Sequence, residues 1–182
     1  MACLTDNGVI ENDAKLIQEF YNRGFGCIKG EVLLLAPVEA LYLTEIKKIT
    51  IEKDDESAKI SKKKGAGFKK MYDIVSLFNE LKRQDKELAT KYYVYRDLRK
   101  KGYVVRTGLK YGAFFRVYEK GVRPGEGHSH WLVHPIPEQQ KISLYELSRA
   151  VHLSHSVRKK MLWAVVNSEG SITYYKIERM QP

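Results

Sequence analysis

The sequence predicts a mixed α/β protein of the α+β type, with a small mixed N-terminal domain and a C-terminal domain whose central mixed β-sheet is flanked by helices. Apolar residues recur at helical spacing in some segments and form short β-branched or aromatic runs in others. Segments of the second kind dominate after residue 102. A chain of 182 residues, 43% of them hydrophobic, is long enough for two small cores. We therefore divide it into domains 1–86 and 87–182, with the boundary between residues 84 and 90.

The N-terminal domain begins with a predicted helix over residues 14–21, whose apolar side chains form one stripe. Asn12 precedes this helix as the candidate N-cap, and Gly24 follows it as a stop signal. Residues 31–35 contain a continuous apolar run, which is typical of a buried strand. Pro37 suits the first position of the next helix, where a proline loses no helical hydrogen bond. Residues 46–51 alternate weakly and indicate one more strand.

Between residues 53 and 70 the composition changes to charged residues. An acidic group at 54–56 is followed by a lysine run at 62–64, with little apolar content. This pattern indicates an exposed loop or the start of an exposed helix, and the lysine run is also a candidate contact for RNA. Helical spacing resumes from residue 68 and again over residues 88–101, where it ends at Gly102.

The C-terminal domain is predicted to consist of strands, short turns and one capped helix. Ser143 and Glu146 form a capping box, so a helix should begin there. Residues 131–134 are predicted as a short strand that Pro135 and Pro137 interrupt. The other predicted strands share β-branched and aromatic content and span residues 103–107, 113–118, 161–166 and 172–177.

Positive charge is concentrated in the second half of the chain. Residues 1–91 contain 16 Lys and Arg against 15 Asp and Glu, a balance of +1, whereas residues 92–182 contain 16 against 7, a balance of +9. All five histidines also lie in the second half. An excess of this kind is typical of a surface that binds a polyanion such as nucleic acid, although a generally basic protein has the same property.

Other features of the sequence indicate where in the cell the protein is located. No stretch approaches the roughly 20 apolar residues needed to span a membrane, and the N-terminus lacks the pattern of a secretory signal. Cys3 and Cys27 form no CxxC motif and have no histidine nearby, so we interpret them as free thiols. These features predict a cytoplasmic protein with no membrane partner.

Three histidines, His128, His130 and His134, fall within seven residues. Alternate residues of a strand share a face, so the HxH pair could bind zinc. Yet no carboxylate or cysteine completes a ligand set nearby, and the surrounding residues are basic. The sequence also lacks the Lys-Ser/Thr pair of a nucleotide-binding loop and the carboxylate cluster of a metal-dependent nuclease. We therefore predict neither a metal nor another cofactor.

A histidine can instead donate a proton near neutrality, because its ordinary pKa is about 6.5. Cleavage of RNA by its own 2′-hydroxyl needs a base, an acid and positive charge near the phosphorus. Tyrosine, histidine and lysine can supply all three without a metal. Such a tyrosine needs cationic neighbours, because a phenol with the ordinary pKa of about 10 is a poor base at neutral pH.

Several ordered motifs in the second half are more specific than these residue types alone. They are residues 95–99 (YRDLR), 102–110 (GYVVRTGLK), 114–118 (FFRVY), 127–133 (GHSHWLV) and 157–160 (VRKK). In this order and at this spacing they resemble the archaeal tRNA-splicing endonucleases and the related catalytic subunits of the eukaryotic enzyme. The resemblance covers residues 92–179 and extends more loosely over the N-terminal half.

The resemblance implies a catalytic role for three residues. Tyr118, which ends the FRVY motif, matches the general base, and His128, which opens the His-Ser-x-aromatic motif, matches the general acid. Lys159 matches the lysine that stabilises the charged phosphorane. His130 is the alternative acid, and Lys160 the alternative lysine, although on a strand Lys160 should point to the opposite face.

The resemblance also implies the substrate and its products. The family cleaves precursor tRNA at bulge-helix-bulge exon–intron junctions without a metal, leaving a 2′,3′-cyclic phosphate and a 5′-hydroxyl. Cationic side chains of the family sandwich a flipped bulge base, and Arg149, His152 and Lys176 lie in the corresponding regions of this chain.

The resemblance also implies an assembly: in the family two active sites face two bulges, which indicates a homotetramer, or a heterotetramer with a structural subunit. In the family an acid-rich loop docks into the opposing subunit, whereas the equivalent residues 134–141 contain one acidic residue, Glu138. The alternative function is a noncatalytic RNA-binding or structural subunit of such a heterotetramer. The presence of the tyrosine, histidine and lysine argues against it.

Overall fold

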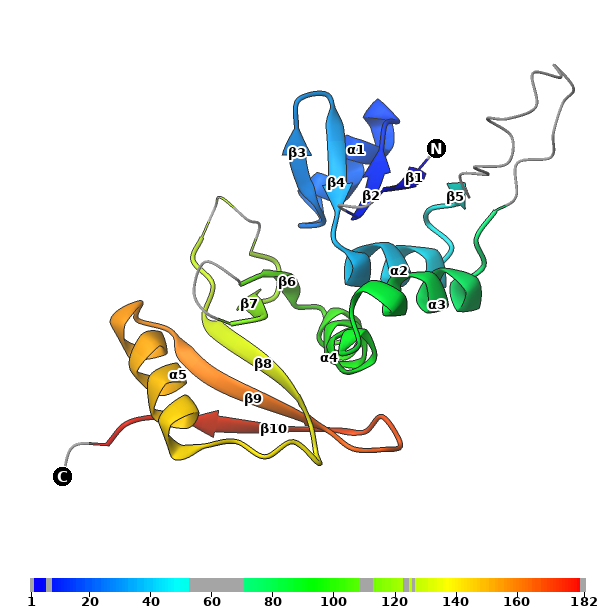
Figure 1. Ribbon diagram of the computed structural model, residues 1–182. Coiled ribbons are helices and arrows are strands. Elements are labelled where there is room, and N and C mark those ends of the chain that lie inside the picture. The colour runs from blue at the N-terminus through cyan, green and yellow to red at the C-terminus, as the bar shows by residue number, and fades with distance from the viewer. Residues whose placement is uncertain are drawn as a thin grey trace, which may run out of the picture. The chain divides into compact units, whose positions relative to one another are not determined.

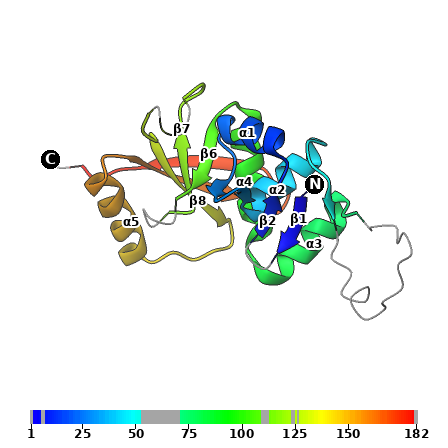
Figure 2. The ribbon, with the colours of Figure 1, turned by 90° about the horizontal axis from the view of Figure 1, so that it is seen from above.

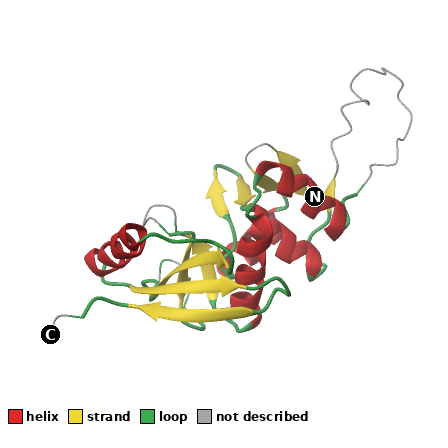
Figure 3. Ribbon diagram, turned by 60° about the horizontal axis from the view of Figure 1, so that its bottom comes forward, coloured by secondary structure: helices red, strands yellow, loops and turns green. Residues whose placement is uncertain are grey.

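The structure is a computed structural model that describes residues 2–5, 8–52, 71–108, 113–122, 125 and 127–180. The chain forms two compact units, Met1–Lys86 and Glu87–Pro182, and each contains one five-stranded sheet with helices (Figures 1 and 3). Both sheets combine parallel and antiparallel pairs, so the predicted α+β class is confirmed. In the described part of the chain, no helix is long and apolar enough to cross a membrane.

The first unit has a mixed sheet in the order β3-β4-β2-β1-β5. Its elements are β1 (Ala2–Thr5), β2 (Gly8–Glu11), α1 (Ala14–Asn22), β3 (Cys27–Lys29), β4 (Val32–Leu35), α2 (Pro37–Glu45), β5 (Ile51–Glu52) and α3 (Ile74–Gln84). The helix that begins at Pro37 is confirmed. Strands β1, β2 and β3 were not predicted, because runs of three or four residues are too short to show a period.

Three predicted boundaries in this unit differ from the structure. The cap of α1 is Asp13 and not Asn12: a carboxylate oxygen of Asp13 accepts the first free N–H groups of the helix, from Lys15 at 2.9 Å and Leu16 at 3.1 Å. Hydrogen bonds from Leu16 and Lys15 also lower the pKa of the Asp13 carboxyl. Of the predicted strand 46–51, only Ile51 lies in a strand, β5 (Ile51–Glu52). Helix α3 begins at Ile74 rather than at residue 68, because Asp73 caps it; the predictions for residues 53–70 lie outside the described residues.

The second unit has a mixed sheet in the order β10-β9-β8-β7-β6. Its elements are α4 (Leu88–Lys100), β6 (Val104–Thr107), β7 (Phe115–Tyr118), β8 (Trp131–Pro137), α5 (Leu144–Ser156), β9 (Lys160–Val166) and β10 (Ile172–Ile177). Strands β8 and β9 are parallel, and the other pairs are antiparallel. Strand β8 lies between α5 and α4 (Figures 1 and 2), so the predicted sheet flanked by helices is confirmed.

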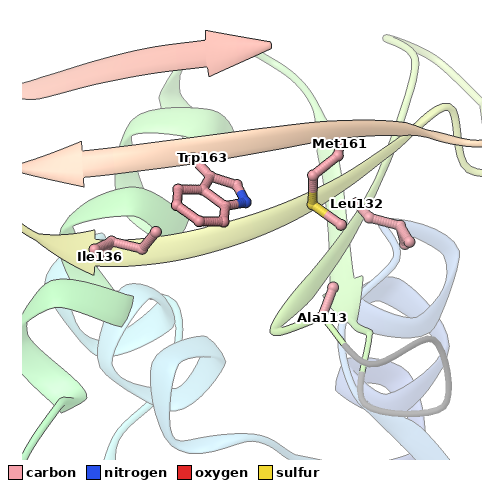
Figure 4. Close-up of a cluster of buried hydrophobic side chains, with 5 residues drawn as sticks. All are labelled: Ala113, Leu132, Ile136, Met161 and Trp163. Carbon is pink, nitrogen blue, oxygen red and sulfur yellow. The ribbon is translucent and has the colours of Figure 1, made fainter. Parts of the chain in front are cut away.

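The two faces of this sheet pack against different helices, because successive residues of a strand point to opposite sides. One face, here called the α5 face, carries Leu132 and Met161, which form a buried cluster with Trp163 (Figure 4). Leu147 and Ala150 of helix α5 pack against this cluster. The α4 face is the opposite one, where Tyr95 of α4 packs on Phe115 with ring centroids 5.8 Å apart.

The prediction that Pro135 and Pro137 interrupt strand β8 is wrong. It continues to Pro137, with Pro135 opposite Ala164 and Pro137 opposite Val166 of β9. The described pairing of β8 with β7 ends at Val133. Beyond that residue the edge of β8 that faces away from β9 needs no N–H donor, so the prolines are tolerated there.

Candidate functional site

Three strand ends meet at one end of the second sheet. Strand β7 is antiparallel to β8, and β8 is parallel to β9, so the last residue of β7 lies beside the beginnings of both other strands. Tyr118 ends β7, His128 lies three residues before β8, and Lys159 directly precedes β9. Neighbouring strands are about 4.8 Å apart. The topology thus brings three residues that are distant in sequence to one end of the sheet.

Tyr118 lies on the α5 face of the sheet. Its neighbour Val117 is the register partner of Trp131, and alternation turns Tyr118 to the other side. The Tyr118 residue is 5% exposed. Arg116 lies two residues earlier on the same side, with its guanidinium carbon 5.9 Å from the Tyr118 ring centroid. The phenol is therefore held by its strand beside a cationic side chain.

His130 is turned away from Tyr118 by a β-bulge. Its backbone N–H donates to the carbonyl of Val117 at 2.9 Å, although Val117 is already the register partner of Trp131. Two consecutive residues thus face one residue of β7, which interrupts the alternation of side chains. The rings of His130 and Trp131 lie together, with centroids 4.5 Å apart, and the Nδ1 atom of His130 is 3.7 Å from Glu119.

His128 lies two residues before this bulge, outside the strand, and is exposed. Alternation along a strand predicts that His128 and His130 share a face, but the strand begins at Trp131 and the bulge places His130 beside Trp131. Among the described residues, no three His, Cys, Asp or Glu side chains are grouped so that they could hold a metal ion.

The end of helix α5 positions Lys159. The backbone N–H of Arg158 donates to His155 and that of Lys159 donates to Ser154, at 3.0 and 2.8 Å, which is the hydrogen-bond pattern of a Schellman motif. This turn places Arg158 in the left-handed region with φ 53°. The side-chain ammonium of Lys159 then donates to the carbonyl of Ser129 at 2.8 Å.

Lys160 has a different environment from Lys159. It is the first residue of β9 and the register partner of Trp131, which places it on the α4 face. Its side chain is exposed. The two adjacent lysines therefore differ in their contacts, and it is Lys159 that reaches the histidine segment.

A small basic hollow adjoins Lys159. It has a volume of about 160 Å³, and its lining includes Ser154, His155, Lys159, Lys160, Lys176 and Arg179. The ammonium of Lys176 also pairs with Glu178. The sequence did not indicate His155 or Arg179, although His155 lies four residues before Lys159 at the end of the same helix. The hollow adds further positive charge to the end of the sheet where the three strand ends meet.

The three predicted base-contacting residues are not gathered in one place. Lys176 lines the basic hollow with Lys159. His152 is exposed on α5 and lines a neighbouring hollow with Arg179. Arg149 lines another cavity, of about 320 Å³, together with Trp163 and other residues of the α5 face. The structure thus brings Lys176, and more loosely His152, toward Lys159, but it does not bring Arg149 there.

Comparisons with known proteins match both units. The family model described as the tRNA intron endonuclease catalytic C-terminal domain matches residues 88–174, and that of the tRNA intron endonuclease N-terminal domain matches residues 2–62. The chain is 39% identical over 168 residues to the tRNA-splicing endonuclease of Pyrococcus furiosus, covering 92% of this chain and 88% of the relative. It is 36% identical over 176 residues to that of Thermococcus kodakarensis (96% and 95% coverage) and 39% identical over 158 residues to that of Methanothermobacter thermautotrophicus (87% and 84%).

Proposed function

Because the chain belongs to the tRNA intron endonuclease family and is an endoribonuclease, we propose that it cleaves precursor tRNA at bulge-helix-bulge exon–intron junctions without a metal ion. The observation that carries this proposal is the meeting of Tyr118, His128 and Lys159 at one end of the catalytic unit's sheet. The proposed products are a 2′,3′-cyclic phosphate and a 5′-hydroxyl.

In the proposed reaction Tyr118, as phenolate, removes the proton from the 2′-hydroxyl of the nucleotide before the junction. The 2′-oxygen forms a bond to the phosphorus, and the bond from phosphorus to the 5′-oxygen breaks. His128 gives its proton to that 5′-oxygen as it leaves. Lys159 lies near the phosphoryl oxygens and stabilises the additional negative charge of the phosphorane. The base finishes protonated and the acid deprotonated, so protons and charges balance.

The choice between the neighbouring histidines and lysines follows from their surroundings. The ring of His130 packs against Trp131 on the α4 face, whereas Tyr118 lies on the α5 face. Lys160 also lies on the α4 face. These contacts support His128 as the acid and Lys159 as the phosphate-stabilising lysine.

We propose that Lys176, His152 and Arg149 contact the flipped bulge base. Lys176 lines the basic hollow next to Lys159, and His152 lines the adjacent one, which supports a contact of both with RNA beside the proposed site. Arg149 remains a candidate from the family resemblance, and its cavity is distinct from the basic hollow. Substituting each residue by alanine and measuring RNA affinity would rank them.

We also propose that the chain forms a homotetramer, with a heterotetramer as the alternative. Strand β10 is an edge strand of the described sheet, and its outer edge offers backbone groups for pairing. Glu138, the acidic residue of the expected docking segment, instead accepts hydrogen bonds from Ser168 and Gln139 within its own unit. Light scattering on the purified chain measures the assembly: a dimer or monomer that is active only with a second chain would contradict the homotetramer.

A cleavage assay in excess EDTA tests the reaction. The protein is incubated with a bulge-helix-bulge RNA, and the product ends are identified by mass spectrometry and by their response to phosphatase and kinase. We expect cyclic phosphate and 5′-hydroxyl ends, with an unchanged rate in EDTA. The matched control is the same RNA with a 2′-deoxy nucleotide before the junction, which should stay intact because it lacks the nucleophile. Cleavage of that control, dependence on Mg²⁺ or 5′-phosphate ends would overturn the proposal.

A further inference from the structure

The α4 face of the second sheet has a hollow of its own, at the same end as Tyr118 but on the opposite side. Its volume is about 370 Å³, and it lies between the end of α4 and the strands beside it. Its lining includes Leu98, Tyr103, Val117, Trp131, Leu162 and Tyr174. None of the residues proposed for catalysis or base contact lines it. We call it the aromatic hollow.

The rings of the aromatic hollow are held in place by contacts among themselves and with α4. Tyr103 and Trp131 meet edge to face, with centroids 5.5 Å apart and planes at 83°. The hydroxyl of Tyr174 donates to the carboxylate of Asp97 on α4 at 2.7 Å. All three rings are half-buried, so each keeps part of its surface accessible. The rings are thus preorganised, with limited freedom to lose when a ligand binds.

Two exposed lysines lie beside these rings. The ammonium of Lys120 is 5.4 Å from the ring centroid of Tyr103, and that of Lys101 is 5.0 Å from the centroid of Tyr174. Lys101 is also paired with Asp97 at 2.7 Å. Among the residues that the structure describes, Asp97 is engaged by Lys101 and Tyr174, and Glu119 lies beside His130. Lys120 is the cation at the rim that is best placed for an anionic ligand.

The chemistry of the hollow suits a flat aromatic group that carries a phosphate. Its lining includes apolar side chains such as Val117 and Leu162, which offer no hydrogen bonds and so would not select one base over another. Aromatic side chains on a sheet, with cations at the rim, are the combination by which proteins bind unpaired nucleotides. A peptide side chain could contact the apolar lining, but it would not use the lysine beside Tyr103.

We propose that the aromatic hollow binds one unpaired nucleobase of an RNA strand, with the adjoining phosphate at Lys120. The proposal rests on the proposed function, because that function supplies RNA as the ligand. Val117 is the chain neighbour of Tyr118, so the bound nucleotide lies close to the scissile phosphate, around the end of the sheet. The hollow would hold the strand beside the cleavage site without selecting its sequence.

Tryptophan fluorescence tests the proposal, because the sequence contains two tryptophans and Trp131 lines the hollow. A Trp163→Phe variant leaves Trp131 as the fluorophore. The probe is a short single-stranded 2′-O-methyl oligouridylate, which cannot be cleaved because its 2′-oxygens are blocked. The matched probe has the same backbone without bases. We expect the first probe to quench Trp131 and the abasic probe to leave it unchanged.

Substitutions at the rim extend the test. Tyr103→Leu should weaken binding of the oligouridylate about tenfold, in the range found for loss of one base–aromatic stack, and Tyr103→Phe should retain it. Lys120→Gln, at an exposed position, should weaken binding and reduce its dependence on salt concentration. Circular dichroism of each variant checks that it is folded, and Lys120→Gln keeps the test decisive even if Tyr103→Leu does not fold.

Several results would overturn the proposal: no quenching, equal quenching by the abasic probe, or normal affinity in the folded rim variants. A changed oligomeric state of Lys120→Gln in light scattering, with unchanged RNA affinity, would instead assign the hollow to a subunit contact. Cleavage of the bulge-helix-bulge RNA by the unmodified chain is measured separately. Cleavage without base-dependent quenching refutes only the proposal that the aromatic hollow binds a nucleobase. Quenching without cleavage refutes only the proposed function.

Discussion

The ammonium of Lys159 donates a hydrogen bond to the backbone carbonyl of Ser129 at 2.8 Å, across thirty residues of sequence. Ser129 lies between His128 and His130, so this bond ties the start of β9 to the segment that supplies the proposed acid. The backbone adds a second link, because Lys160 donates its N–H to the carbonyl of His130 at 3.1 Å. The lysine and the histidine segment are therefore positioned together.

Replacing Lys159 should slow the chemical step. We expect Lys159→Ala to lower the single-turnover rate at saturating RNA by about 10²- to 10³-fold, the usual effect of removing a group that stabilises transition-state charge. Lys160→Ala is the matched control. Lys160 lines the basic hollow, but the hydrogen bond to Ser129 in the histidine segment is made by Lys159. The Lys160 change should therefore weaken RNA binding and alter the saturated rate by less than about threefold. Equal loss of rate in both variants would refute the assignment.

The two histidines should differ in the same kind of assay. His128→Ala should lower the cleavage rate by about 10²- to 10⁴-fold, the range for general acid catalysis, whereas His130→Ala should have a much smaller effect. A substrate with sulfur in place of the leaving 5′-oxygen makes the test specific, because a thiolate leaves without protonation. It should restore cleavage by His128→Ala. If His130→Ala shows the large loss and the sulfur rescue, the roles are reversed.

Tyr118→Phe should separate catalysis from packing. The ring is buried, and phenylalanine fills the same space, so the free energy of unfolding should change by less than about 1.5 kcal/mol. The cleavage rate should fall by about 10²- to 10⁴-fold, because the hydroxyl is the proposed base. Urea unfolding and single-turnover cleavage measure the two effects. A variant that retains most of its rate would exclude Tyr118 as the base.

Tyr174 should make stability depend on alkaline pH. Burial first, and then the hydrogen bond and charge of Asp97, raise the pKa of the Tyr174 phenol far above its ordinary value. Below about pH 10 the folded and unfolded chains both keep this proton, so its contribution to stability is complete. As pH rises further, the unfolded chain loses the proton first and the free energy of unfolding falls.

Urea unfolding between pH 8 and pH 11 measures this dependence. Tyr174→Phe should show a shallower decline above pH 10, because it has no phenol to ionise. Tyr175→Phe is the matched control, since the neighbouring Tyr175 is 53% exposed and its change should leave the decline as in the unmodified chain. The same decline in all three proteins would contradict the role given to Tyr174.

The capping box of α5 should contribute to stability. The hydroxyl of Ser143 accepts the N–H of Glu146 at 3.2 Å, and Ser143→Ala should lower the free energy of unfolding by about 1 kcal/mol. Ser148→Ala, within the same helix and exposed, is the control and should be neutral or slightly stabilising. Thermal and urea unfolding at pH 7 measure both changes. A neutral Ser143→Ala would show that the box adds nothing to α5.

Acid should weaken the same box. The backbone N–H of Ser143, and then its hydroxyl, lower the pKa of the Glu146 carboxyl. The contribution is therefore complete above the ordinary pKa of about 4.3 and is lost as pH falls through the lower folded value. Glu146→Gln should lack this part of the acid dependence when unfolding is followed from pH 6 to pH 2.

The sequence by itself determined the features that depend on local chemistry. The start of α2 at Pro37 and of α5 at the Ser143–Glu146 box follow from bonds between residues at most four positions apart. The family could also be recognised, because its motifs are contiguous runs of residues. Helix boundaries were predicted less accurately where two adjacent residues could both act as the cap. At α1, for example, the cap is Asp13 and not Asn12.

Only the tertiary structure decided how distant segments meet. The pairing of β8 with β9 carries the strand through its prolines, and the register of β7 against Trp131 creates the bulge that turns His130 away from Tyr118. The Lys159–Ser129 bond and the aromatic hollow likewise join residues from separate strands and helices. The spacing of apolar residues along one strand shows which of its residues share a face. The register between two strands then decides which residues of one strand lie beside which residues of the other.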